Sequence, residues 1–171
     1  MDNVPSWWQT VIMTLAATRP ASWFLVRVLP DLDGIVLKLT KNRQTATQVL
    51  TGRPVLTITT RGARTGRMYQ TPLLYLQEGE NYLLIATKFG RRENPGWYYN
   101  IRAHPEVEVT LNGETSRYLG AEVKGSERRA YWERAVAHYP GYSKYQDRAA
   151  GRRIPIIILT PLEQMAEEDQ G

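Results

Sequence analysis

The chain of 171 residues contains no cysteine and only two histidines. Without cysteine it can form no disulfide and no thiolate metal site, and it has no cysteine nucleophile. His104 and His138 are too few for a three-histidine zinc site. Because the remaining side chains do not shuttle electrons, any redox chemistry would depend on an organic cofactor.

Long apolar runs are also missing. The apolar stretch 11–17 has no basic region before it, and the stretch 23–29 is interrupted by Arg27 and followed by Pro30. A membrane span needs about 20 apolar residues, so neither stretch predicts a signal peptide or a transmembrane helix. We therefore expect a cytoplasmic protein.

Acidic residues are concentrated at the C-terminus. Residues 163–171 contain four acids and no base, and we expect this tail to be disordered. Residues 1–162 then hold 22 bases against 13 acids, a net charge of +9. Such a surface attracts phosphates, nucleic acid or an acidic membrane, although a merely solvated charged face is an equally open interpretation.

The length predicts a single domain, in which residues 1–52 form a helical N-terminal extension. Apolar residues recur at helical spacing over 4–15 and again over 32–39. The tryptophan-rich face of this extension could pack in the core, contact a second subunit or anchor the protein peripherally to a membrane. The sequence therefore leaves open whether the chain is a monomer or a homodimer.

From residue 53 the apolar pattern changes to the period of strands. Short strands rich in β-branched and aromatic residues alternate with tight turns, which is typical of an antiparallel sheet that curls closed. We predict an α+β barrel of about six mainly antiparallel strands over 53–162, with helices packed on it. The predicted strands are 54–60, 68–76, 82–87, 107–111, 116–124 and 154–160, and the predicted helices are 96–103, 126–138 and 139–148.

Two stretches carry residues suited to an anionic ligand. In 59–72, three arginines surround one glycine-flanked hairpin turn, where guanidinium groups, hydroxyls and turn amides can bind a phosphate. In 87–100, a basic loop leads into a helix that begins near Gly96, and helix amides attract negative charge. Trp97 can lie against a flat heterocycle and Asn100 can bond a ring edge, although packing and capping are the alternative roles.

These stretches resemble the deazaflavin-dependent nitroreductase family, and the resemblance extends over about 130 residues. The family pairs a Gly-Arg-x-Ser-Gly-like turn before a Pro-Leu strand with an Asn-Pro-x-Trp-Tyr-x-Asn helix. This chain has the corresponding residues at 62–66, 71–73 and 94–100, in the same order and at near-equal spacing. Ala63 and Tyr69 stand where relatives often have basic residues, and Leu74 where some have a tyrosine.

The resemblance implies a split β-barrel like that of flavin-nucleotide oxidases, holding coenzyme F420 with its acidic tail on the basic hairpin. It implies an enzyme that transfers a hydride from reduced F420 to a quinone, nitroaromatic or other conjugated acceptor. The expected cofactor-binding residues are Arg61, Arg64, Thr65, Gly66, Arg67, Thr87, Lys88, Gly96, Trp97 and Asn100.

Three tyrosines at spacing i, i+3 and i+6 resemble the substrate-pocket tyrosines of the family. They are Tyr139, Tyr142 and Tyr145, and they fall roughly on one helical face. As catalytic residues they would sandwich a planar acceptor and donate a hydrogen bond or a proton to it. An aromatic packing stripe is the simpler interpretation of the same spacing.

Two other functions remain open from the sequence. A non-catalytic carrier would bind F420, or FMN instead, without turnover. A nucleic-acid-binding barrel is suggested by arginines interleaved with aromatics, but here the bases cluster near turns instead of lining a strand face. We therefore expect a small-molecule hydride acceptor and no nucleic acid, and no metal site.

Overall fold

The computed structural model describes residues 55–162. They form six strands, three α-helices and one short 3-10 helix. In chain order the elements are β1 (Val55–Arg61), β2 (Met68–Glu78), β3 (Asn81–Ile85), η1 (Lys88–Gly90), α4 (Gly96–Ala103), β4 (Glu106–Leu111), β5 (Glu114–Glu122), α5 (Glu127–His138), α6 (Gly141–Arg148) and β6 (Ile156–Pro161).

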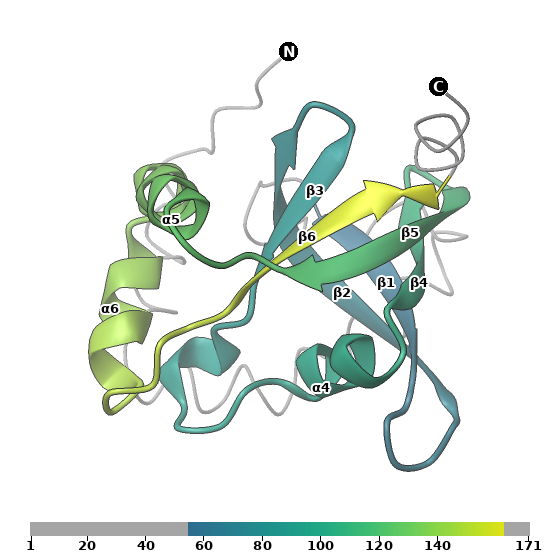
Figure 1. Cartoon of the computed structure of the whole chain (residues 1–171), viewed down its shortest axis with the longest axis horizontal. Helices are drawn as coiled ribbons and strands as arrows, with labels where there is room; N and C mark the ends of the chain where they lie inside the picture. The colour runs from purple at the N-terminus through teal and green to yellow at the C-terminus, as the bar shows by residue number, and fades with distance from the viewer. Residues whose placement is uncertain (1–54, 163–171) are drawn as a thin grey trace, which may run out of the picture.

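The six strands close into a barrel in the order β1-β2-β3-β6-β5-β4, with β4 pairing back onto β1 (Figure 1). Every neighbouring pair is antiparallel. Closure leaves the barrel without a free sheet edge. The predicted fold class is confirmed, since the α+β split barrel with helices packed on it is the architecture observed.

The predicted element bounds differ from the observed ones mainly at loops. The third strand ends at Ile85 instead of residue 87, because the next residues turn into η1 inside the predicted loop. The last helix begins at Gly141 instead of residue 139, since Pro140 precedes its first turn. The last strand begins at Ile156, after Pro155.

One hydrophobic cluster fills the barrel. Leu56, Ile58, Leu84 and Ile157 point inward from the strands and are fully buried. Helix α4 adds Trp97, Tyr98 and Ile101 to the same cluster, so it is packed against the barrel interior. This packing fixes the position of the helix whose first turn belongs to the candidate site.

A second cluster covers the outer face of β3 and β6. Leu83, Ile85 and Ile156 alternate with the inward residues of their strands and pack against α5 and α6. Both faces of these two strands are therefore buried, which explains why the final strand has the continuous apolar sequence Ile-Ile-Ile-Leu. In Figure 1, α5 and α6 lie beside this part of the barrel.

The predicted helical extension 1–52 and the predicted acidic tail 163–171 lie outside the described residues. Within 55–162, no helix has the length and apolar character needed to cross a membrane.

Candidate cofactor-binding site

The turn between β1 and β2 is held in a defined shape by its own backbone. The Gly62 amide donates to the Arg67 carbonyl at 2.7 Å, and the Gly66 amide donates to the Gly62 carbonyl at 2.9 Å. Gly66 has a φ of +67°, which is the left-handed region that favours glycine. The glycines therefore permit a compact turn with its side chains facing outward.

Asn100 ties this turn to helix α4. Its Nδ2 donates to Thr60 Oγ1 at 3.1 Å, and its Oδ1 accepts from the Ala63 amide at 3.0 Å. Thr60 is fully buried, so its hydroxyl depends on this protein partner. Asn100 thus acts in this structure as a tether, and its predicted contact with a cofactor ring stays a prediction.

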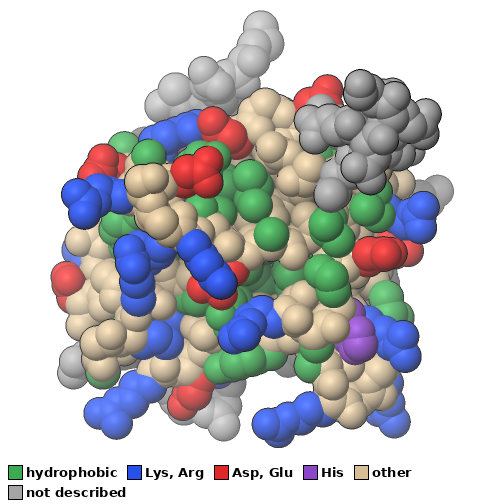
Figure 2. Space-filling model, in the orientation of Figure 1, with side chains coloured by type: hydrophobic (Ala, Val, Ile, Leu, Met, Phe, Trp, Pro, Cys, Tyr) green, Lys and Arg blue, Asp and Glu red, His purple; other side chains and the backbone are tan. Residues whose placement is uncertain are grey.

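Three arginines of the hairpin have no acidic partner within the part of the chain that the structure describes. Arg61, Arg64 and Arg67 are exposed, and none of them belongs to an ion pair among residues 55–162. The structure therefore brings together three guanidinium groups that are free to bind an external anion. Figure 2 shows basic side chains projecting from the lower part of this face, where Figure 1 places α4 and the β1–β2 turn.

The turn amides contribute less than the sequence suggests. Four of them, those of Gly62, Ala63, Gly66 and Arg67, are used in hydrogen bonds inside the protein. The Thr65 hydroxyl is also engaged, because Oγ1 accepts from the Arg67 amide at 3.3 Å and bonds the Tyr69 hydroxyl at 3.1 Å. Any anion bound at this turn would therefore be held chiefly by the arginine side chains.

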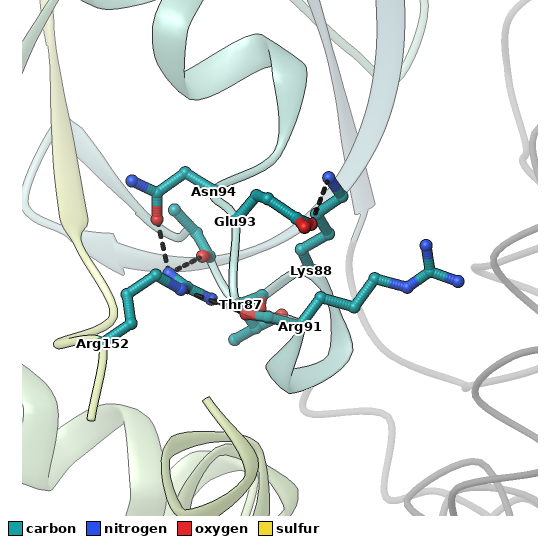
Figure 3. Close-up of polar contacts among 7 residues, drawn as sticks. Thr87, Lys88, Arg91, Glu93, Asn94 and Arg152 are labelled. Carbon is teal, nitrogen blue, oxygen red and sulfur yellow. Dashed lines mark hydrogen bonds and ion pairs between the residues drawn. The ribbon is translucent and has the colours of Figure 1, made fainter. Parts of the chain in front are cut away.

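The loop between β3 and α4 carries the predicted site residue Lys88, whose ammonium group is paired. Lys88 Nζ lies 3.3 Å from Glu93 Oε2, as the dashed line between them in Figure 3 shows. The hydrogen bond from Lys88 lowers the pKa of the Glu93 carboxyl, with the lysine charge acting in the same direction. Thr87, the other predicted contact in this loop, accepts from the Phe89 amide through Oγ1 at 3.4 Å.

Helix α4 begins without a side-chain cap. Pro95 occupies the N-cap position and offers no capping side chain, and a Cβ at Gly96 would meet no atom within 4 Å. Among the described residues the start of the helix is therefore open, and the predicted contact of Gly96 with the cofactor stays a prediction. Trp97 is 7% exposed and packs in the barrel core, and its predicted place along the cofactor ring also stays a prediction.

The three predicted catalytic tyrosines are close together and buried. Tyr139, Tyr142 and Tyr145 are 4–8% exposed, and their rings contact one another edge to face. The hydroxyls of Tyr139 and Tyr145 lie 3.2 Å apart, and burial raises the pKa of the Tyr145 phenol. They belong to the outer cluster, with Phe89 stacked edge to face on Tyr145 at 5.8 Å. This geometry favours packing, and a direct role with the acceptor stays a prediction.

Sequence reasoning missed Arg152, which precedes β6 and reaches across to the β3–α4 loop (Figure 3). Its hydrogen-bond partners lie 58 to 66 residues earlier in the chain. No local pattern marks it, since it is one of two adjacent arginines before an apolar strand.

Comparison with known proteins decides the family. The sequence model of the F420H(2)-dependent quinone reductase family matches residues 36–161. The chain belongs to this family. The resemblance found in the sequence is thereby confirmed, with quinone reductase as the activity in the family's description.

Relatives of this chain support the assignment. The F420H(2)-dependent quinone reductase Rv1261c of Mycobacterium tuberculosis H37Rv is 32% identical over 110 residues, which are 63% of this chain and 73% of the relative. A solved F420-H2 dependent reductase, FDR-A, is 35% identical with a TM-score of 0.57 over 63% of this chain and 94% of that one. A solved domain-swapped dimer is 30% identical with a TM-score of 0.59, covering 82% of this chain and 99% of that one.

The donor set of this site fits the cofactor that the family name implies. F420 has an acidic tail and a flat ring system. The described part of this chain offers three arginines that form no ion pair within it, and a helix start without a side-chain cap. The open space at Gly96 leaves room for a ligand at the helix amides. Arg61, Arg64 and Arg67 would hold the tail, and the start of α4 would meet the ring system.

The Asn100 tether predicts a measurable coupling. Asn100→Leu removes both hydrogen bonds and leaves the buried Thr60 hydroxyl without its partner, which should cost about 1 to 3 kcal/mol of unfolding free energy. Thr60→Val should then cost less in the Asn100→Leu background than in the wild type. Urea unfolding of the four proteins measures this double-mutant cycle, and strictly additive costs would contradict the tether.

Proposed function

We propose that this chain binds reduced F420 at the hairpin and the first turn of α4, and transfers its hydride to a quinone. The observation that supports this most directly is a set of three arginines, without acidic partners among residues 55–162, at a turn that Asn100 fixes to α4. An acidic cofactor tail is the ligand that this charge pattern matches. Family membership adds F420 as the cofactor.

The protein contributes binding and orientation. Arg61, Arg64 and Arg67 bind the anionic tail, and Lys88 adds a fourth cation once it leaves Glu93. The first turn of α4 presents amides to the ring system. When bound, reduced F420 supplies a hydride from the ring carbon that replaces a flavin nitrogen. The protein itself would hold the two reactants in the orientation that hydride transfer requires, and it would exclude water.

Nitroaromatics and other conjugated acceptors are included in the proposal as alternative substrates. The name of the relative Rv1261c favours a quinone. A carrier that binds F420 or FMN without turnover is the competing function.

We also propose that the chain forms a homodimer, since a relative 30% identical to it was solved as a domain-swapped dimer. Light scattering of the purified protein measures the mass directly. The predicted peripheral membrane contact involves residues 1–52, outside the described residues, and it stays a prediction.

The activity is tested by mixing the full chain with reduced F420 and menadione. We expect oxidation of F420 at a rate that saturates with both substrates, because the reaction requires both to be bound together. Binding of F420 without turnover would indicate the carrier. Tight binding of FMN with none of F420 would contradict the cofactor assignment.

Arg64→Ala should weaken F420 binding by about 1 to 3 kcal/mol, the cost of losing one charge-assisted contact. Titration calorimetry measures the affinity. Arg129→Ala on α5 is the control, since it removes the same charge from an exposed arginine outside the hairpin and should change the affinity little. Equal losses in the two variants would mean that only overall charge matters.

Tyr139→Phe should slow hydride acceptance more than it weakens F420 binding, because the phenol would stabilise negative charge on the acceptor. Single-turnover oxidation of bound F420 by menadione separates the two effects. If the rate changes only in proportion to a lower melting temperature, the hydroxyl pair with Tyr145 is a packing feature.

A further inference from the structure

The β3–α4 loop contains a strained turn. Lys88, Phe89 and Gly90 all have positive φ, at 46°, 55° and 78°. For lysine and phenylalanine this left-handed conformation is unfavourable, and it persists only where surrounding contacts hold it. Lys88, which pairs with Glu93, belongs to this turn. The contacts that hold the turn therefore also position Lys88.

Two elements hold the turn from outside the loop. Gly90 packs so closely on α6 that a Cβ there would lie 2.6 Å from the Tyr145 carbonyl oxygen. Phe89 lies against the Tyr145 ring. The second element is Arg152, whose guanidinium spans the loop from its beginning to its end (Figure 3).

All three guanidinium nitrogens of Arg152 donate to the loop. Nη2 donates to the carbonyls of Thr87 and Arg91, at 2.9 Å each, and Nε donates to the Arg91 carbonyl at 3.1 Å. Nη1 donates to the Ala86 carbonyl at 3.3 Å and to the Asn94 side-chain oxygen. The carbonyls of Thr87 and Arg91 flank the strained turn, so the planar fork closes it from both sides.

The backbone that carries the Arg152 side chain is held in place by a side chain of α6. Gln146 of α6 donates from Nε2 to the Arg152 carbonyl at 2.7 Å and accepts from the Ile154 amide at 3.0 Å. Within 55–162, neither ion pair includes Arg152, and its five hydrogen bonds all go to neutral oxygens. The Arg152 guanidinium therefore fixes the shape of the β3–α4 loop, and it forms no ion pair with a carboxylate within 55–162.

We propose that Arg152 is a positioning residue of the cofactor site, which holds the loop 86–94 so that Lys88 and the start of α4 face the ligand together. This inference rests on the proposed function, because it names F420 as the ligand. It requires no contact between Arg152 and F420. A lysine cannot replace the fork, since it has one nitrogen and no planar donor pair.

The test compares Arg152→Lys and Arg152→Gln with Arg153→Lys and Arg153→Gln, the same changes at the exposed neighbouring arginine. Both Arg152 variants should bind F420 roughly tenfold to a hundredfold more weakly, the range known for residues that orient ligand-binding groups. The Arg153 variants should stay within about twofold of wild type, because surface charges act weakly. Retained affinity in Arg152→Lys, with a loss only in Arg152→Gln, would overturn the proposal in favour of simple charge attraction.

Two further measurements separate positioning from direct contact and from unfolding. The salt dependence of F420 affinity should keep its slope in Arg152→Gln, whereas the slope should flatten in Arg64→Ala, which loses an ionic contact. Asn94→Ala removes only one of the five hydrogen bonds, so it should fold normally and lose affinity in the same direction. A flattened slope in Arg152→Gln would mean that Arg152 itself binds the anion.

Hydrogen exchange tests the inference without any cofactor. Amides of 87–93 should exchange faster in both Arg152 variants than in wild type, while the barrel strands keep their protection. Unchanged exchange in the loop would overturn the positioning role even if F420 binds. The wild type could show the expected exchange difference from the variants and yet bind no F420. In that case the proposed function is wrong, while the role of Arg152 in holding the loop is supported.

Discussion

The fold depends on the burial of both faces of β3 and β6. Leu84 and Ile157 point into the barrel, while Leu83 and Ile156 point outward under α5 and α6. Burying a side chain of this size stabilises the protein by about 1.5 to 3 kcal/mol. These two strands therefore join the barrel core to the helical layer. The segment 86–95, which follows β3, and the segment 149–155, which precedes β6, are each anchored at one end to a fixed strand.

The barrel core places helix α4, but the loops of the candidate site are also held by polar contacts. Side-chain to backbone hydrogen bonds connect them. Asn100 joins the hairpin turn to α4, and Arg152 joins the segment before β6 to the β3–α4 loop. Each such bond satisfies a backbone group that a loop leaves without a ladder partner. The exposed cations thus project from loops whose geometry is fixed by polar contacts.

The barrel could be predicted from the sequence because its signals are local. Strand alternation, the tight turns between strands and the apolar final strand each depend on a few neighbouring residues. The family motifs likewise indicated the hairpin and α4. Asn100 and Arg152 differ, since they bond backbone groups 37 to 66 residues away and no short pattern records such partners. The left-handed turn at Lys88 and Phe89 was equally hidden, because neither residue type favours it.

For Tyr139, Tyr142 and Tyr145, the sequence predicted proximity but not the role of the side chains. Their spacing correctly placed them together, but spacing does not distinguish a pocket lining from a packed interior. In the structure Tyr145 contacts Phe89 and lies close to Gly90, so it helps to hold the loop that carries Lys88.

Glu93 competes with any bound anion for Lys88, because the two side chains form an ion pair. Any anion that recruits this lysine must displace a tethered carboxylate only five residues away in the chain, whose local concentration is high. A ligand with a single weak charge gains little from that exchange, whereas a polyanionic tail held at the same time by the hairpin arginines can outcompete it. If the chain binds its cofactor as proposed, Glu93 would therefore act as an internal counterion that favours a tail with several negative charges.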